Sequence, residues 1–160
     1  MPIELKICGI NSKNIIQTII QSGGCQYLGF VFYPPSPRNL SIAESEKLTS
    51  IVPNHIKKVA VLVKPENSFV EKIKDQFDYL QVYETSPLKS KSLKLISNKK
   101  IIQAIKIKKE DDVNLYKHDQ KRVVSPAEAL KYSDYIIMGR SLMTGDIEKN
   151  LNRVMISLKE

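Results

Sequence analysis

The sequence predicts an α/β fold: a parallel sheet covered by helices, arranged as a truncated barrel of repeated βα units. Short apolar segments alternate with helix-like segments, and the apolar segments begin at a nearly constant spacing. Apolar strands separated by helices are typical of parallel sheets, which are covered on both faces. No Gly- or Ser-rich linker interrupts the pattern, so we expect one domain over residues 1–160.

Six segments have the composition of buried strands. They span residues 3–9, 26–33, 58–63, 78–83, 100–107 and 134–139. Val123 and Val124 could form a short seventh strand. A complete eight-stranded α/β barrel usually takes about 250 residues. The 160 residues of this chain therefore rule out a complete barrel, and we expect a truncated barrel that lacks about two βα units.

Helices are expected between the strands, and two of them begin at clear capping signals. Ser12 precedes a segment of helical periodicity over residues 14–21, which ends at Gly23. Ser41 is followed three residues later by Glu44, the pattern of a capping box. The remaining helices are expected over residues 66–75, 87–97 and 110–117, from residue 125, and over residues 146–158.

The formal net charge of +8 comes mainly from lysines that are spread along the chain. Neither a basic stretch interleaved with aromatic residues nor a recognition helix is evident, so we expect no nucleic-acid partner. A basic surface does favour small anionic substrates through long-range steering.

The sequence favours a cytoplasmic protein without a cofactor. It lacks the roughly eighteen consecutive apolar residues of a membrane span and a secretory signal, so no membrane contact is expected. Cys8 and Cys25 fit neither a disulfide framework nor a zinc motif. His55 and His118 are too scattered for a metal cluster.

Candidate functional residues follow the carboxyl ends of the strands, where parallel βα barrels carry their active sites. A thiol such as Cys8 can act as a general base when cations favour its thiolate form, although a lone cysteine is more often a buried structural residue. Arg38 could clamp a carboxylate or phosphate, or be an exposed surface residue. Gly139 and Arg140 would suit an anion at the last strand, although such dipeptides are common.

Two motifs, KICGI at residues 6–10 and LGFVFYPPSPR at residues 28–38, resemble phosphoribosylanthranilate isomerase. The resemblance covers residues 3–117 and implies a (β/α)₈ barrel. It also implies an intramolecular isomerase of tryptophan biosynthesis, which converts an aminoaldose into an aminoketose by an Amadori rearrangement. In this reading Cys8 is the general base, and Arg38 binds the anthranilate carboxylate.

The chain departs from the family pattern in several places, since it also lacks the Gly-rich strand-seven segment and the usual final strand that help bind phosphate in the family. Tyr83 stands where the family usually has a histidine. The family's general acid, an aspartate at the end of strand six, has no counterpart here, so we expect impaired activity. Asp119 is a candidate replacement.

Residues 118–150, which contain HDQKRVVSPAEALKYSDYIIMGRSLM, resemble the end of orotidine 5'-phosphate decarboxylase. That resemblance implies that Gln120 and Arg140 bind a substrate phosphate, and it places a junction near residues 116–119. The decarboxylase's catalytic Lys and Asp cluster has no match, so decarboxylation is not expected. The alternative to an isomerase is a non-catalytic barrel remnant that binds sugar phosphates. An open barrel could also cover its edges by forming a homodimer.

Overall fold

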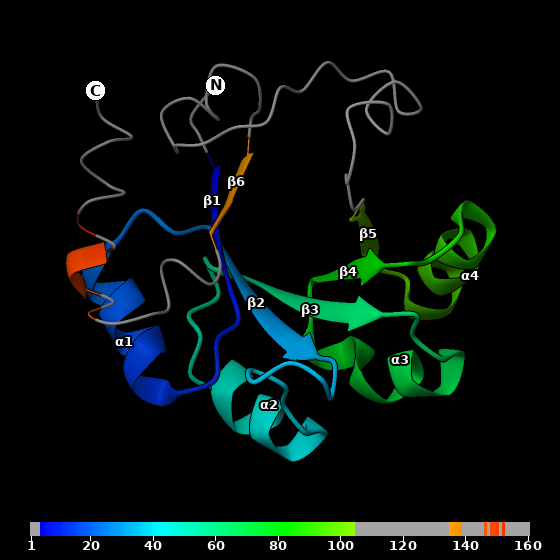
Figure 1. Cartoon of the computed structure of the whole chain (residues 1–160), viewed down its shortest axis with the longest axis horizontal. Coiled ribbons are helices and arrows are strands. Elements are labelled where there is room, and N and C mark those ends of the chain that lie inside the picture. Colours follow the sequence, from blue (N-terminus) through cyan, green and yellow to red (C-terminus); the bar gives the residue numbers. More distant parts are fainter. Residues whose placement is uncertain (1–3, 105–134, 139–145, 147, 151, 153–160) are drawn as a thin grey trace.

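The computed structural model describes residues 4–104, 135–138, 146, 148–150 and 152. These residues form a parallel sheet with the strand order β5-β4-β3-β2-β1-β6. In Figure 1 the helices α1–α4 follow one another along one side of this sheet. This is the alternating βα arrangement that the sequence predicts.

The strands coincide with the predicted apolar segments within a few residues. Their bounds are Glu4–Cys8 for β1, Tyr27–Phe32 for β2, Lys57–Val63 for β3, Tyr79–Tyr83 for β4, Lys100–Gln103 for β5 and Tyr135–Met138 for β6. The strand β6 pairs with β1, so the last described strand lies beside the first. The possible strand at Val123 and Val124 lies outside the described residues.

A capping serine precedes three of the described helices α1–α4, whereas the Glu66 side chain before α3 makes no capping hydrogen bond. The helices are α1 (Lys13–Ser22), α2 (Ile42–Thr49), α3 (Asn67–Ile73) and α4 (Pro87–Ser97). The Ser12 hydroxyl accepts from the backbone N–H of Ile15 at 3.4 Å. Ser41 and Glu44 form the predicted capping box. Proline at the first position of α4 follows the capping Ser86, and the bounds of this helix are those predicted.

The structure shortens one of the predicted helices and describes part of another. The helix expected over residues 66–75 is shorter, because α3 ends at Ile73 and the chain tightens into a 3₁₀ turn over Lys74–Gln76. Helical residues 148–150 and 152 fall within the last predicted helix, and the Asp146 carboxylate accepts from the N–H of Lys149 at 3.0 Å. The helices expected over residues 110–117 and from residue 125 lie outside the described part.

The hydrophobic core lies between the sheet and the helices. Alternate strand residues, among them Leu5, Ile7, Phe30 and Leu80, are at most 1% exposed and pack with residues from the helices. Aromatic rings add contacts to this layer: the Phe30 and Phe77 ring centroids lie 5.8 Å apart. Within the described residues, no helix is both long and apolar enough to cross a membrane.

Candidate functional site

The second face of the sheet carries the polar side chains. Successive strand residues point to opposite faces. Because Leu5 and Ile7 belong to the helix-facing core, Lys6 and Cys8 lie on the other face of β1. A barrel turns this second face inward, so it forms the floor beneath the loops at the carboxyl ends of the strands.

The half-buried Cys8 is the last residue of β1 and pairs with Gly29 on β2. Gly29 leaves space for the thiol, since a Cβ atom built on Gly29 would lie 3.0 Å from Cys8 Sγ. The backbone N–H groups of Gly9 and Ile10 donate to the Gly29 carbonyl at 2.9 and 3.0 Å. These bonds hold the end of β1 firmly against β2.

A buried lysine shares this space with the thiol. Lys6 is 3% exposed, and its Nζ has no hydrogen-bond partner of acceptable geometry in the described structure. The Cβ atom built on Gly29 would lie 2.7 Å from this Nζ, so amine and thiol flank the same point. Burial lowers the pKa of the Lys6 ammonium, while the neighbouring Cys8 acts in the opposite direction.

Arg38 reaches the same strand end from the loop after β2. Its Nη1 donates to the Cys8 carbonyl at 3.3 Å. The guanidinium lies over Gly9, where an added Cβ would come within 2.5 Å of Nη1. Gly9 also has a φ of 94°, in the left-handed region that favours glycine. The KICGI and SPR motifs therefore meet at one place, because Gly9 makes room for Arg38.

Two residues of β4 contribute a second polar pair. Gln81 Nε2 donates to the Tyr83 hydroxyl at 2.8 Å, whereas the buried Gln81 Oε1 has no partner within the described part. Burial raises the pKa of the Tyr83 phenol, and the charge of a Cys8 thiolate acts in the same direction. Tyr83 therefore lies within electrostatic range of the thiol.

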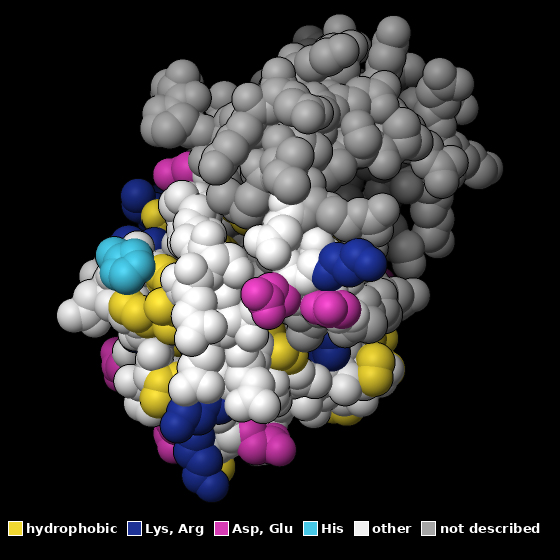
Figure 2. Space-filling view, turned by 90° about the vertical axis from the view of Figure 1, so that its left-hand side faces the viewer, with side chains coloured by type: hydrophobic (Ala, Val, Ile, Leu, Met, Phe, Trp, Pro, Cys, Tyr) yellow, Lys and Arg dark blue, Asp and Glu magenta, His cyan; other side chains and the backbone are white. Residues whose placement is uncertain are grey.

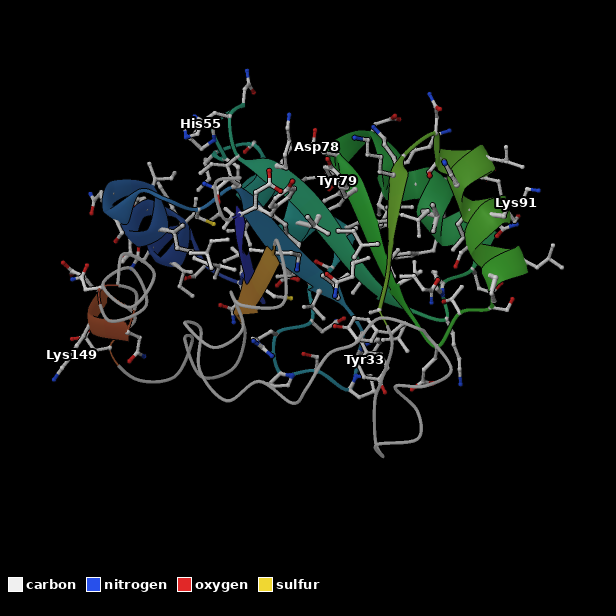
Figure 3. All side chains as sticks on the ribbon, turned by 90° about the horizontal axis from the view of Figure 1, so that it is seen from above. Tyr33, His55, Asp78, Tyr79, Lys91 and Lys149 are labelled. Atoms are coloured by element: carbon white, nitrogen blue, oxygen red, sulfur yellow. The ribbon has the colours of Figure 1, made fainter. Side chains whose placement is uncertain are left out.

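The strand-end loops next to these residues are tightly shaped. Lys64 and Glu84 follow β3 and β4 with left-handed φ values of 44° and 49°. Their side chains form an exposed ion pair of 3.0 Å, and the Lys64 N–H donates to the Tyr83 carbonyl at 3.1 Å. Figure 3 shows Tyr33 at this end of the sheet, while His55, Asp78 and Tyr79 lie at the opposite end.

Together these groups bring a half-exposed thiol, a buried amine, a guanidinium and a phenol to one end of the sheet. Such a set can remove a proton from carbon and hold an anionic substrate. Within the residues the structure describes, no group of three or more His, Cys, Asp or Glu side chains is arranged to hold a metal ion. On the molecular face in Figure 2 the charged side chains are scattered.

The structure brings two of the sequence-predicted site residues together, Cys8 and Arg38. The predicted phosphate-binding residues Gln120, Gly139 and Arg140 lie outside the described residues, as does Asp119. Sequence reasoning missed Lys6 and Gln81. The signal was available, since each is a polar residue within a short apolar strand, at the alternating positions that share a face with Cys8 and Tyr83.

Comparison with known proteins gives a consistent family. Residues 5–127 match the model of the N-(5'phosphoribosyl)anthranilate (PRA) isomerase family. An N-(5'-phosphoribosyl)anthranilate isomerase of Paramagnetospirillum magneticum is 34% identical over 85 residues, 52% of this chain and 39% of that protein. The same enzyme of Parvibaculum lavamentivorans is 28% identical, over 91% of this chain and 73% of that protein. The chain spans about half or less of the first curated relatives it matches.

Solved structures show the same fold. A monomeric form of the dimeric phosphoribosylanthranilate isomerase of Thermotoga maritima superposes with a TM-score of 0.80 at 18% identity, covering 98% of each chain. A phosphoribosyl anthranilate isomerase in complex with reduced 1-(o-carboxyphenylamino)-1-deoxyribulose 5-phosphate gives a TM-score of 0.76 at 18% identity, covering 98% of this chain and 97% of the other. At these identities the likeness shows the fold: a parallel α/β half-barrel similar to barrel-shaped isomerases.

Proposed function

Because the chain belongs to the N-(5'-phosphoribosyl)anthranilate isomerase family, we propose that it catalyses the isomerisation of N-(5'-phosphoribosyl)anthranilate in tryptophan biosynthesis. One observation carries the proposal. The two motifs of the family resemblance converge, so that the Arg38 guanidinium bonds the carbonyl of Cys8 at 3.3 Å. A base and an anion-binding group thus lie at the carboxyl end of the same strand, where barrel enzymes carry their chemistry.

The proposed roles follow from the chemistry of an Amadori rearrangement. Cys8, as a thiolate, removes the proton from the ribose carbon next to the imine carbon. Arg38 binds the anthranilate carboxylate, and it can do so with two parallel hydrogen bonds. The ligand of the related isomerase structure carries both a carboxyphenyl group and a phosphate. The same two anionic groups on the substrate suit the basic side chains described here.

The general acid must come from another residue, since the usual strand-six aspartate has no counterpart in the sequence. Tyr83 is the described group best suited to donate a proton at this end of the sheet. Gln81 donates to its oxygen at 2.8 Å, which leaves the phenol proton for another acceptor. Asp119 remains the alternative acid. A weaker acid predicts slow turnover, since acid–base catalysis contributes about 10²–10⁴-fold.

The phosphate is assigned to the end of the chain. We propose that Gln120, Gly139 and Arg140 bind it, as the resemblance of residues 118–150 to orotidine 5'-phosphate decarboxylase implies. The family match runs to residue 127, beyond the junction proposed near residues 116–119. Both enzyme types place a phosphate at this end of their barrels, so a joined chain retains one site for it.

A steady-state assay with N-(5'-phosphoribosyl)anthranilate tests the proposal. Turnover by the wild type and a loss of about 10²–10⁴-fold in Cys8→Ala would support it. Cys25→Ala is the matched control, because Cys25 lies in the core on the other face of the sheet. No turnover, or equal turnover by wild type and Cys8→Ala, would overturn the proposed reaction.

The second candidate is a sugar-phosphate-binding protein without catalysis. It predicts that the reduced carboxyphenylamino-deoxyribulose phosphate raises the melting temperature although turnover is absent. Arg140→Ala should abolish that rise. A homodimer, as in the dimeric relative from Thermotoga maritima, is also proposed, and sedimentation at several concentrations tests it.

A further inference from the structure

We propose that Lys6 activates Cys8, its buried ammonium holding the thiol in the thiolate form that a general base requires. Lys6 is thus a positioning residue that acts through Cys8. The use of this thiolate in catalysis rests on the proposed isomerase function. The pairing itself rests on the geometry of β1 and β2.

The positions of Lys6 and Cys8 on β1 make their side chains neighbours. They occupy alternate positions of β1 and lie on the face opposite Leu5 and Ile7. Both Lys6 Nζ and Cys8 Sγ lie within 3.0 Å of the position that a Cβ atom of residue 29 would occupy. Gly29 therefore opens a small space that amine and thiol share. Any larger residue would force them apart.

A lysine at this buried position lowers the stability of the folded state unless an opposite charge lies beside it. The side chain is 3% exposed, and its Nζ lacks a hydrogen-bond partner in the described structure. A buried ammonium without a partner destabilises the folded state, and a methionine of similar length would fill the space without that cost. A thiolate on the adjacent Sγ supplies the missing opposite charge.

The other groups around Cys8 are compatible with this role. Arg38 donates to the backbone carbonyl of Cys8 at 3.3 Å and adds a second cation. On β4, the Tyr83 phenol is uncharged at neutral pH, because both burial and Cys8 raise its pKa. Cys25 lies across the strand in the core, where burial raises the pKa of its thiol to about 11. Cys25 is therefore a thiol rather than a competing anion.

The ionisation of Cys8 balances in protons and in charge. The Sγ–H bond of Cys8 breaks, the proton passes to the unprotonated Lys6 amine or to water, and the electron pair stays on sulfur. The product is a thiolate beside an ammonium, with no net change in charge when Lys6 is the acceptor. When the thiolate later takes a proton from substrate carbon, the same pair returns that proton to solvent.

The pH dependence of Cys8 alkylation tests the pairing without any substrate. The rate of carbamidomethylation by iodoacetamide is measured by peptide mass spectrometry from pH 5 to 10, with Cys25 as an internal slow thiol. In Lys6→Met the midpoint for Cys8 should rise by at least about one pH unit, a tenfold fall in rate near neutral pH. Lys100→Met, which removes an exposed strand lysine of β5, is the matched control and should leave the midpoint unchanged.

A second variant protects the test against misfolding. Gly29→Ala places a methyl group between Nζ and Sγ and should also raise the midpoint, while circular dichroism reports the fold. An unchanged midpoint in folded Lys6→Met, or in folded Gly29→Ala if the first variant does not fold, would overturn the proposal. A shifted midpoint in a protein without isomerase activity would support the pairing and contradict the proposed function, so the two failures are distinguishable.

Discussion

The two faces of the sheet are built from the same strands but differ in the polarity of the side chains that they bury. The helix-facing positions carry apolar side chains such as Leu28, Phe30 and Leu80, all of them fully buried and part of one hydrophobic core. The opposite positions carry Lys6 and Gln81, which are equally buried and yet include polar atoms without partners. One face therefore packs against the helices as an apolar core, and the other also buries polar groups at a cost in stability.

The largest expected effect is a loss of stability when a core residue on the helix-facing side is truncated. Phe30→Ala should lower the free energy of unfolding by about 3–5 kcal/mol, because it removes a fully buried ring and leaves a cavity beside Phe77. Urea denaturation measures the change. Leu88→Ala on α4, where the side chain is 80% exposed, is the control and should stay within about 0.5 kcal/mol of wild type. Equal losses would contradict the division between the faces.

A smaller effect is expected at the strand end. Gly9→Ala should cost about 1–3 kcal/mol for its left-handed backbone and should also displace Arg38. Gly23→Ala is a matched control, because Gly23 has a φ of 68° and open space around its Cβ position. Titration with the reduced carboxyphenylamino-deoxyribulose phosphate should show weaker binding for Gly9→Ala alone. Equal affinity in both variants would contradict the role of Gly9 in seating Arg38.

The buried lysine predicts a signature in the pH dependence of stability. Its pKa is lower in the folded state, so the unfolded state binds more protons between that lowered pKa and the ordinary value of about 10.4. Over this window the Lys6 contribution to stability rises with pH. Cys25 acts oppositely above about pH 8.5, since its raised pKa makes the folded state bind more protons.

The difference in unfolding free energy between wild type and Lys6→Met isolates Lys6 together with the Cys8 thiol beside it, because Cys25 is common to both. Chemical denaturation at several pH values should show wild type gaining on Lys6→Met as pH rises through the window. A difference independent of pH would mean that folding does not lower the pKa of Lys6.

The smallest effect on stability is expected in the exposed loops that follow β3 and β4. Lys64→Met breaks the ion pair with Glu84, but the two side chains are 69% and 52% exposed. Such pairs contribute about 0–1 kcal/mol and are screened by salt. Thermal melts at low and high salt should therefore differ little between this variant and wild type. A loss of stability comparable to that of Phe30→Ala would show that these exposed loops also contribute strongly to stability.

Local signals in the sequence predicted most of the described fold. The capping box of Ser41 and Glu44 and the proline that begins α4 are short-range patterns, so they could be read directly. The end of α3 at Ile73 could not, because the 3₁₀ turn that follows is not marked by a glycine or proline. Of the site, Cys8 and Arg38 were recognisable from their motifs.

Other parts of the site depend on the register between strands, which the sequence does not state. The Lys6 amine lies beside the Cys8 thiol because Gly29, opposite Cys8, leaves space for both. That pairing is set by the alignment of β1 with β2. The bond between Gln81 and Tyr83 joins residues of one strand, yet only the curvature of a barrel brings such groups toward Cys8. The motifs therefore pointed to Cys8 as the proposed base, and the sequence left the residues around it unidentified.

The position of β6 beside β1 has a consequence for the order in which the protein folds during synthesis. Glu4 and Leu5 of the first strand align with Tyr135 and Ile136, which leave the ribosome more than a hundred residues later. Until then one edge of β1 has no partner, and closing so long a loop is slow. Among the strands that the structure describes, the one that carries Cys8 is thus made before the others and is among the last to be completed.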